Sequence, residues 1–209
     1  MSISSVCKAN IISNALAYIE NPRRRIYIDC TCTAAGAKGG WIFLIILGID
    51  PGIAIVGYGV IEYKNAKFRA LAYGAIRTPA HTPVEERLKT IHERLSEIIE
   101  KFSPDEFVAE ELFFNSNTTT AIAVAEARGV ILLTAAEHGL KVNEYTPLQI
   151  KQSVVGYGKA EKSQVMLMVR TILNLKDPPK LDDTNDALAA AICHAHTSGS
   201  RVKQFYNLK

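Results

Sequence analysis

The sequence predicts an α/β domain in which three consecutive strands are followed by alternating helices and further strands. First, residues 44–49 form a continuous apolar run, typical of a strand that is covered on both faces. Second, two strand-like segments follow this run closely along the chain. Third, the remaining chain alternates helical periodicity with short apolar segments. This order predicts a mixed sheet, an antiparallel three-strand meander followed by parallel strands, with helices packed on it.

The meander is expected from three segments in close succession, at residues 44–49, 52–62 and 67–76. The turn-prone Lys64-Asn65 pair separates the second from the third. Pro83 then opens an amphipathic helix, in which apolar residues recur every three or four positions as far as Phe102.

The later elements alternate in type. We expect them in the order strand, helix, strand and three helices, at about residues 107–112, 118–138, 142–146, 147–154, 160–175 and 183–196. Gly139, the Gly156–Gly158 segment and Pro178 supply the breaks between them. The helix over 118–138 has a face of small residues, which allows close packing either within the domain or across a dimer.

Three regions are expected along the chain. Residues 1–42 show no sustained periodicity and are interpreted as an N-terminal extension, residues 43–197 as the domain, and residues 198–209 as a short basic C-terminal tail. The apolar run 41–49 is far shorter than the roughly 20 residues of a membrane span, so no membrane partner is expected. The four cysteines are too scattered for a disulfide framework, which favours a reduced, cytoplasmic location.

The charge distribution does not by itself indicate nucleic acid. The net charge is +3, but the basic excess lies in residues 1–43, and residues 44–209 carry equal numbers of basic and acidic residues. Any case for DNA therefore depends on the placement of individual groups.

Three segments each present carboxylates that a common site could use. Asp50 ends the first apolar strand, Glu110 and Glu111 lie in a later strand, and Asp183 and Asp186 share one face of the last helix. Taken singly, a turn, a solvated strand edge and helix N-terminal charges explain them. Adjacent strand residues face opposite sides, so only one glutamate can join Asp50. Together they predict a site for two Mg²⁺ ions, which can activate water and stabilise a leaving oxygen during attack on phosphate.

These motifs, in this order, resemble the RuvC family of Holliday-junction resolvases, with a match from about Leu44 to His196. They are Asp50 in Gly-Ile-Asp-Pro-Gly, Glu110 in Ala-Glu-Glu-Leu-Phe-Phe, Arg128 in Glu-Ala-Arg-Gly, Lys151 in Gln-Ile-Lys-Gln-Ser-Val-Val-Gly, Lys162 in Ala-Glu-Lys-Ser-Gln-Val, and the pair Asp183-x-x-Asp186-Ala-Leu-Ala.

The resemblance implies a ribonuclease-H-like fold with helices on both faces of the sheet. It also implies a homodimer that cleaves four-way DNA junctions in recombination and repair by paired symmetric nicks, with two metal ions, Mg²⁺ or Mn²⁺. The RuvA and RuvB branch-migration proteins are the implied partners. The catalytic and metal-binding set carried over is Asp50, Glu110, Asp183 and Asp186. The family starts close to its first strand, whereas about 42 residues precede it here.

The resemblance also implies three DNA-binding residues. Phe113 matches the position of an aromatic wedge that enters between bases near the junction centre, and Lys151 and Lys162 match phosphate-contacting lysines. Without the resemblance, a core phenylalanine and solvated lysines are the simpler interpretations. His194 and His196 near the end of the last helix are interpreted as favourable charges at a helix C-terminus.

Three alternatives remain at this point. A sugar-kinase or actin-like ATPase would need a second phosphate loop and a nucleotide site. A non-catalytic DNA-binding module would have to maintain a costly cluster of carboxylates. A nuclease of the same fold acting on RNA–DNA hybrids differs from a junction resolvase only in the groups that hold its substrate.

Overall fold

The computed structural model describes residues 43–111 and 118–206, and the side chains of residues 44–111 and 121–198 within them. The main compact unit begins at Leu44. The division of the chain into an extension, a domain and a tail stays a prediction.

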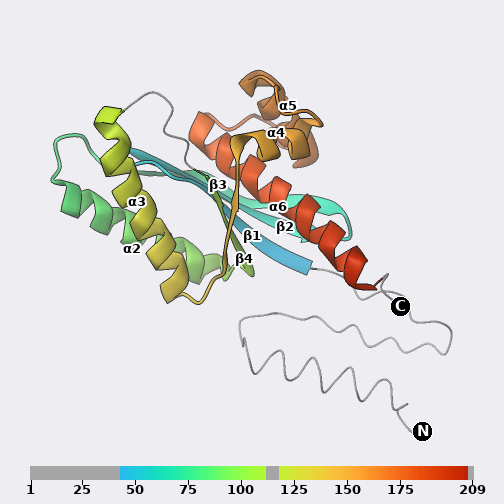
Figure 1. Ribbon diagram of the computed structural model, residues 1–209, viewed down its shortest axis with the longest axis horizontal. Helices are drawn as coiled ribbons and strands as arrows, with labels where there is room; N and C mark the ends of the chain where they lie inside the picture. Colours follow the sequence, from blue (N-terminus) through green and yellow to red (C-terminus); the bar gives the residue numbers. More distant parts are fainter. Residues whose placement is uncertain (1–42, 112–117, 207–209) are drawn as a thin grey trace, which may run out of the picture. The chain divides into compact units, whose positions relative to one another are not determined.

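A five-stranded sheet forms the centre of this unit (Figure 1). Its strands are β1 (Phe43–Asp50), β2 (Ile55–Lys64), β3 (Lys67–Arg77), β4 (Glu106–Glu110) and β5 (Val142–Tyr145), in the order β3-β2-β1-β4-β5. β2 and β3 pair antiparallel, whereas β4 pairs parallel with both β1 and β5. The predicted mixed sheet, with consecutive strands β1, β2 and β3 side by side, is therefore confirmed.

Helices cover both faces of the sheet, also as predicted. α2 (Val84–Phe102) packs against α3 (Thr118–Glu137) on one face. α6 (Asp182–Tyr206) lies across the other face, with α4 (Pro147–Val155) and α5 (Lys162–Ile172) packed on it (Figure 1). The first turn of α2 is acidic and its last turn carries Lys101, which complements the helix dipole.

Small residues on both partners bring α6 very close to the sheet. A methyl group added at Gly48 of β1 would lie 2.1 Å from the carbonyl oxygen of Ala187, and one at Gly57 of β2 would lie 2.0 Å from that of Asp183. On the helix, the facing positions are mostly fully buried alanines. This close approach fixes the position of the first turns of α6 over β1 and β2.

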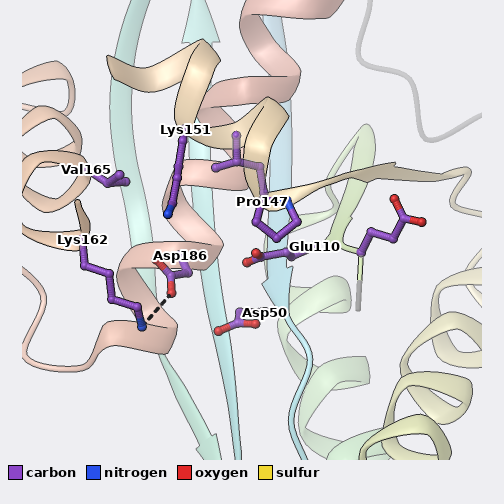
Figure 2. A pocket seen from close by; sticks show the side chains of 9 residues that line it. Asp50, Glu110, Pro147, Lys151, Lys162, Val165 and Asp186 are labelled. Atoms are coloured by element: carbon purple, nitrogen blue, oxygen red, sulfur yellow. Dashed lines mark ion pairs between the residues drawn. The ribbon is translucent and has the colours of Figure 1, made fainter. Parts of the chain in front are cut away.

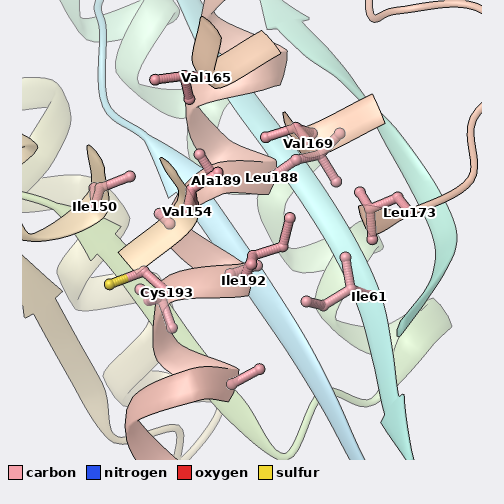
Figure 3. Close-up of a cluster of buried hydrophobic side chains, with 14 of the residues drawn as sticks. Ile61, Ile150, Val154, Val165, Val169, Leu173, Leu188, Ala189, Ile192 and Cys193 are labelled. Carbon is pink, nitrogen blue, oxygen red and sulfur yellow. The ribbon is translucent and has the colours of Figure 1, made fainter. Parts of the chain in front are cut away.

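The core on this face joins the sheet to three helices. Ile46, Ile61 and Val108 of the sheet pack with Leu188 and Ile192 of α6, and buried side chains of α4 and α5 complete the cluster (Figure 3). At about 25 cal/mol per Å² of apolar surface removed from water, such burial is the main force that holds α6 on the sheet.

The last helix is longer than predicted. It was expected to end at about His196, but it continues to Tyr206. Thr197 and Ser198 are weak helix formers, but their hydroxyls donate to the carbonyls of Cys193 and Ala195 within the helix.

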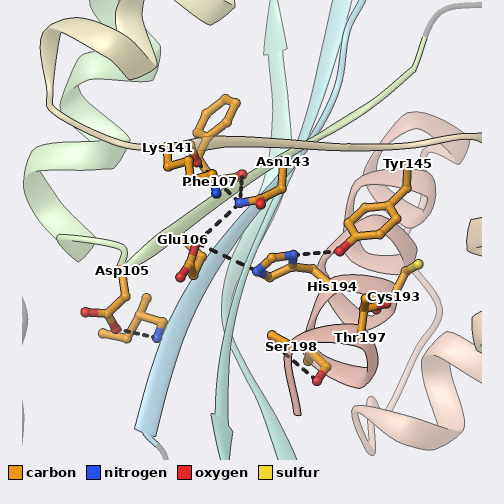
Figure 4. Close-up of polar contacts among 12 residues, drawn as sticks. Asp105, Glu106, Phe107, Lys141, Asn143, Tyr145, Cys193, His194, Thr197 and Ser198 are labelled. Atoms are coloured by element: carbon orange, nitrogen blue, oxygen red, sulfur yellow. Dashed lines mark hydrogen bonds and ion pairs between the residues drawn. The ribbon is translucent and has the colours of Figure 1, made fainter. Parts of the chain in front are cut away.

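The interpretation of His194 and His196 as C-terminal helix charges is therefore wrong. His194 is 4% exposed, its Nδ1 lies 3.0 Å from the hydroxyl of Tyr145, and its Nε2 lies 3.8 Å from Glu106 Oε2 (Figure 4). It joins α6 to β4 and β5. His196 Nδ1 lies 3.2 Å from the hydroxyl of Ser153 in α4, and its ring packs edge-on against Phe68.

Candidate active site

Asp50 reaches the site because of its position in β1. Side chains alternate along a strand, so Asp50 shares with Ile46 and Gly48 the face that α6 covers. The loop after it is fixed by Thr78, whose hydroxyl donates to the carbonyl of Ile53 at 2.5 Å and whose backbone N–H donates to that of Ala54 at 3.1 Å.

Glu110 joins Asp50 because β1 and β4 are parallel neighbours. Ile49 pairs with Ala109, so Asp50 and Glu110 follow at the same edge of the sheet. Val108 faces the core under α6, and Glu110, two residues later, faces the same way. Glu111, the next residue, also lines the cavity at this site, but its carboxylate is not among those that converge with Asp50.

Asp186 completes the group from α6. One carboxylate oxygen each from Asp50, Glu110 and Asp186 lie within 4.8 Å of one another (Figure 2). Asp183, one turn earlier, is not in this group of three. Its charge still acts on both Asp50 and Asp186, and its backbone lies against Gly57. The structure thus brings three of the four predicted carboxylates together and places the fourth beside them.

The carboxylates of this site resist ionisation. Burial, the largest cause, and the nearby charges of Glu110, Asp186 and Asp183 raise the pKa of Asp50 from 3.8 to about 8. Burial and Asp186 raise the pKa of Glu110 from 4.5 to about 7. Burial also raises the pKa of Asp186, against the opposing effect of Lys162. Like charges held this close out of water need a counter-charge.

The donor set matches a divalent cation. All three convergent groups are carboxylates, the hard oxygen ligands that Mg²⁺ and Mn²⁺ prefer, and they come from three separate elements. A bound cation would relieve both the mutual repulsion and the cost of burial. Among the residues that the structure describes, these three form the group suited to a metal ion.

Two lysines lie at the same site. Lys162, the first residue of α5, places Nζ 3.8 Å from Asp186 Oδ2 (Figure 2). The same Nζ lies 3.7 Å from Asp182 Oδ2. Lys151 of α4 lines the cavity and lowers the pKa of Glu110. The cavity has a volume of about 320 Å³ and is lined by Asp50, Glu110, Glu111, Pro147, Ile150, Lys151, Lys162, Val165 and Asp186.

Helix capping orients Lys151. The hydroxyl of Thr146 accepts from the N–H of Gln149, and Gln149 Oε1 accepts from the N–H of Thr146, so α4 begins with a capping box. Ile150 and Val154 anchor the helix in the core, and Lys151 faces the cavity.

The sequence reasoning missed two contributors, and one predicted residue lies outside the described residues. Asn185 is buried and its side chain hydrogen-bonds Asp186, and Asp182 pairs with Lys162. Their place in the acidic motif was the available signal, because the pairing of Asp182 with Lys162 is a tertiary contact and periodicity does not imply a bond between the neighbours Asn185 and Asp186. Phe113, the predicted wedge, falls in the segment 112–117.

A mixed sheet with carboxylates converging from β1, β4 and α6 beside two lysines defines the class of metal-dependent phosphodiester hydrolases with an α/β fold. Comparison with known proteins narrows this class. The family described as crossover junction endodeoxyribonuclease RuvC matches residues 46–194. The chain belongs to the RuvC family.

Curated relatives and solved structures agree with this assignment. The crossover junction endodeoxyribonuclease RuvC of Clostridioides difficile is 59% identical over 155 residues, which cover 74% of this chain and 92% of the relative. That of Heliobacterium modesticaldum is 59% identical over 154 residues, covering 74% of this chain and 95% of the relative. The structure of Thermus thermophilus RuvC in complex with a Holliday junction substrate is 40% identical, covers 76% of this chain and 96% of its own, and superposes with a TM-score of 0.73.

Among the described residues, no helix combines the length and apolar character that a membrane crossing requires.

Proposed function

We propose that this chain is a structure-selective endonuclease that resolves four-way DNA junctions by paired, symmetric nicks. The observation that carries the proposal is the convergence of Asp50, Glu110 and Asp186 at one edge of the sheet, in a fold shared with a RuvC that was solved with its junction substrate. Family membership makes the enzyme a metal-dependent nuclease of the crossover-junction class.

The carboxylates are proposed as ligands of two Mg²⁺ ions. Asp50, Glu110 and Asp186 would hold them, with Asp183 able to join from the preceding turn of α6. When bound, the ions would supply activation of the attacking water and stabilisation of the departing 3′ oxygen, which leaves a 5′ phosphate. The raised pKa values of Asp50 and Glu110 mean that both carboxyls must lose their protons before they can serve as ligands.

Lys151 and Lys162 are proposed to bind the phosphates next to the scissile bond. Both line the cavity that holds the carboxylates, so an entering phosphate would meet ammonium groups on one side of the acidic group. Lys162 pairs with Asp186 and Asp182 in the protein alone, and its large exposure leaves it able to turn toward a phosphate. The wedge role of Phe113 rests on the family resemblance.

A homodimer is proposed from an apolar face of α3. Ile122 and Leu133 are 74% and 56% exposed. The same face also carries the exposed residues Ala125, Gly129 and Ala136. These residues lie three, four or seven positions apart, on one side of the helix. A two-fold dimer would present two acidic sites to strands of like polarity. RuvA and RuvB are proposed as partners, and a cytoplasmic location stays a prediction that rests on the proposed substrate.

The test is cleavage of an end-labelled four-way junction, with and without Mg²⁺ or Mn²⁺. We expect paired nicks at symmetric positions, dependent on metal and not observed on linear duplex. Cleavage of an RNA–DNA hybrid in place of the junction would keep the metal site but refute the proposed substrate. Tight junction binding without cleavage of any substrate would make the acidic cluster structural.

A further inference from the structure

The loop between α4 and α5 contains two glycines that flank Tyr157. Gly156 closes α4 with a φ of +96°, a left-handed conformation that disfavours side chains, and its N–H donates to the carbonyl of Gln152. The next glycine, Gly158, lies so close to Leu148 that an added methyl would be 2.6 Å from the Leu148 side chain. Tyr157 lies between these two glycines, neither of which can be replaced without strain or a clash.

Tyr157 presents an aromatic ring to solvent while its hydroxyl is anchored. The residue is 47% exposed, and its hydroxyl donates to Gln164 Oε1 at 2.7 Å. The same Oε1 accepts from the backbone N–H of Glu161 at 2.9 Å, at the start of α5. A ring held at its far end loses little further freedom when a ligand packs on its face.

The hydroxyl of Tyr157 is anchored at the start of α5, next to Lys162 of the active site. Tyr157 follows Lys151 of α4 and precedes Lys162, and Gln164, which holds its hydroxyl, is two residues beyond Lys162 on α5. Lys159 in the same loop is also exposed. Exposed single apolar residues are common and need no function. An exposed aromatic with an anchored hydroxyl, in a segment that carries three lysines, is the combination that binds nucleic acid strands, because the cations attract phosphates and the ring stacks on bases.

We propose that Tyr157 contacts the DNA substrate by stacking its ring on an unpaired or unstacked base of the strand that enters the acidic site. The proposal rests on the proposed function, since it takes junction DNA as the ligand. Tyr157 would then help the enzyme to prefer the branch point of a junction over fully paired duplex. Bases at the open, deformable branch point are available for stacking.

Loss of a neutral ring and loss of a charged lysine should change the salt dependence of DNA affinity differently. A lysine–phosphate contact releases a counterion, so its loss flattens the plot of log affinity against log salt concentration. A stacking contact releases none, so loss of the Tyr157 ring should lower the affinity equally at every salt concentration. The slope therefore separates direct stacking from an indirect displacement of Lys151 or Lys162.

The experiment measures binding of a fluorescent four-way junction by anisotropy in Mg²⁺ at several salt concentrations, in an Asp50→Asn background that prevents cleavage. Tyr157→Ala should weaken binding by about tenfold with an unchanged salt slope. Tyr157→Phe, which keeps the ring, should stay within about threefold of the parent. Tyr73→Ala removes a comparably exposed tyrosine (41%) from the sheet-edge strand β3 and should bind like the parent. Thermal unfolding verifies that each variant is folded.

Several outcomes would overturn the inference. Unchanged affinity of Tyr157→Ala, equal losses in Tyr157→Ala and Tyr157→Phe, or a flattened salt slope would each exclude stacking. Failure of the parent protein to prefer the junction over linear duplex would instead refute the proposed function.

Discussion

Asp50 is a partly buried carboxylate that the fold holds among other carboxylates at a high electrostatic cost. Burial and three neighbouring carboxylates oppose its ionisation, and Lys162 offsets this only in part. In this environment the carboxyl group favours its neutral, protonated form unless a cation is bound. Its role as a ligand can therefore be separated from its role in the fold by an isosteric neutral replacement.

Asp50→Asn is expected to reduce junction cleavage by at least about a thousandfold, because the amide supplies no negative charge for a metal ion. Junction binding should persist, since the lysines are untouched. Cleavage rates under single-turnover conditions and anisotropy titrations measure the two effects. Glu111→Gln is the matched control, because Glu111 lines the same cavity outside the convergent group, and it should stay within about tenfold of wild type. Near-normal cleavage by Asp50→Asn would contradict the ligand role.

Lys151→Ala should weaken junction binding and reduce the salt slope by about 0.9, the value for one lost phosphate contact. Lys151 lies in the cavity beside Glu110. Lys89→Ala, which removes an exposed lysine of α2 on the opposite face of the sheet, should leave the slope unchanged. Identical slopes for Lys151→Ala and wild type would remove Lys151 from the phosphate-binding group.

At the scale of elements, the site depends on how closely α6 approaches β1. Asp50 and Asp186 belong to different elements, and their oxygens converge because Gly48 and buried alanines allow the helix to lie almost on the strand. Any increase in this spacing would both weaken the core and separate the ligands.

Gly48→Ala should therefore destabilise the protein by about 2 kcal/mol or more, since the new methyl would meet the backbone oxygen of Ala187, which cannot rotate away. We also expect weaker metal binding. Urea unfolding and a Mg²⁺ titration provide the two measurements. A Gly48→Ala protein as stable as wild type would show that α6 can shift at little cost.

Periodicity predicted the elements well where one face of each is buried. The register of β1 against β4 could not be read from the sequence; strand parity admitted only one of Glu110 and Glu111 to the site, and the family resemblance selected Glu110. The end of α6 was misplaced at about His196, because the weak helix formers Thr197 and Ser198 and the following Gly199 suggested a stop, whereas the helix runs on to Tyr206. The pairing of Lys162 with Asp182 and Asp186 is a tertiary contact that no local pattern contains. Asp183 was expected among the converging ligands; its charge acts on Asp50 and Asp186, but it lies outside the group of three.

At the scale of the whole molecule, the acidic cluster links stability to pH and to metal. In the metal-free protein the pKa of Asp50 is raised to about 8 and that of Glu110 to about 7, from 3.8 and 4.5. The folded state therefore binds more protons than the unfolded state between about pH 4 and pH 8. The contribution of these groups to stability is complete below about pH 4 and is lost as the pH rises through about 7 to 8.

A divalent cation should reverse this trend, because it binds the deprotonated carboxylates. We expect 10 mM Mg²⁺ to raise the melting temperature by on the order of 5 °C at pH 8, where occupancy is highest, and by much less at pH 5.5. Differential scanning fluorimetry across this range, with EDTA or MgCl₂, measures the difference. In Asp50→Asn the metal-dependent shift should shrink, and the metal-free protein should lose less stability between pH 5.5 and 8. A shift that is independent of pH, or the same in Asp50→Asn, would mean that Mg²⁺ stabilises the protein elsewhere than at the converging carboxylates.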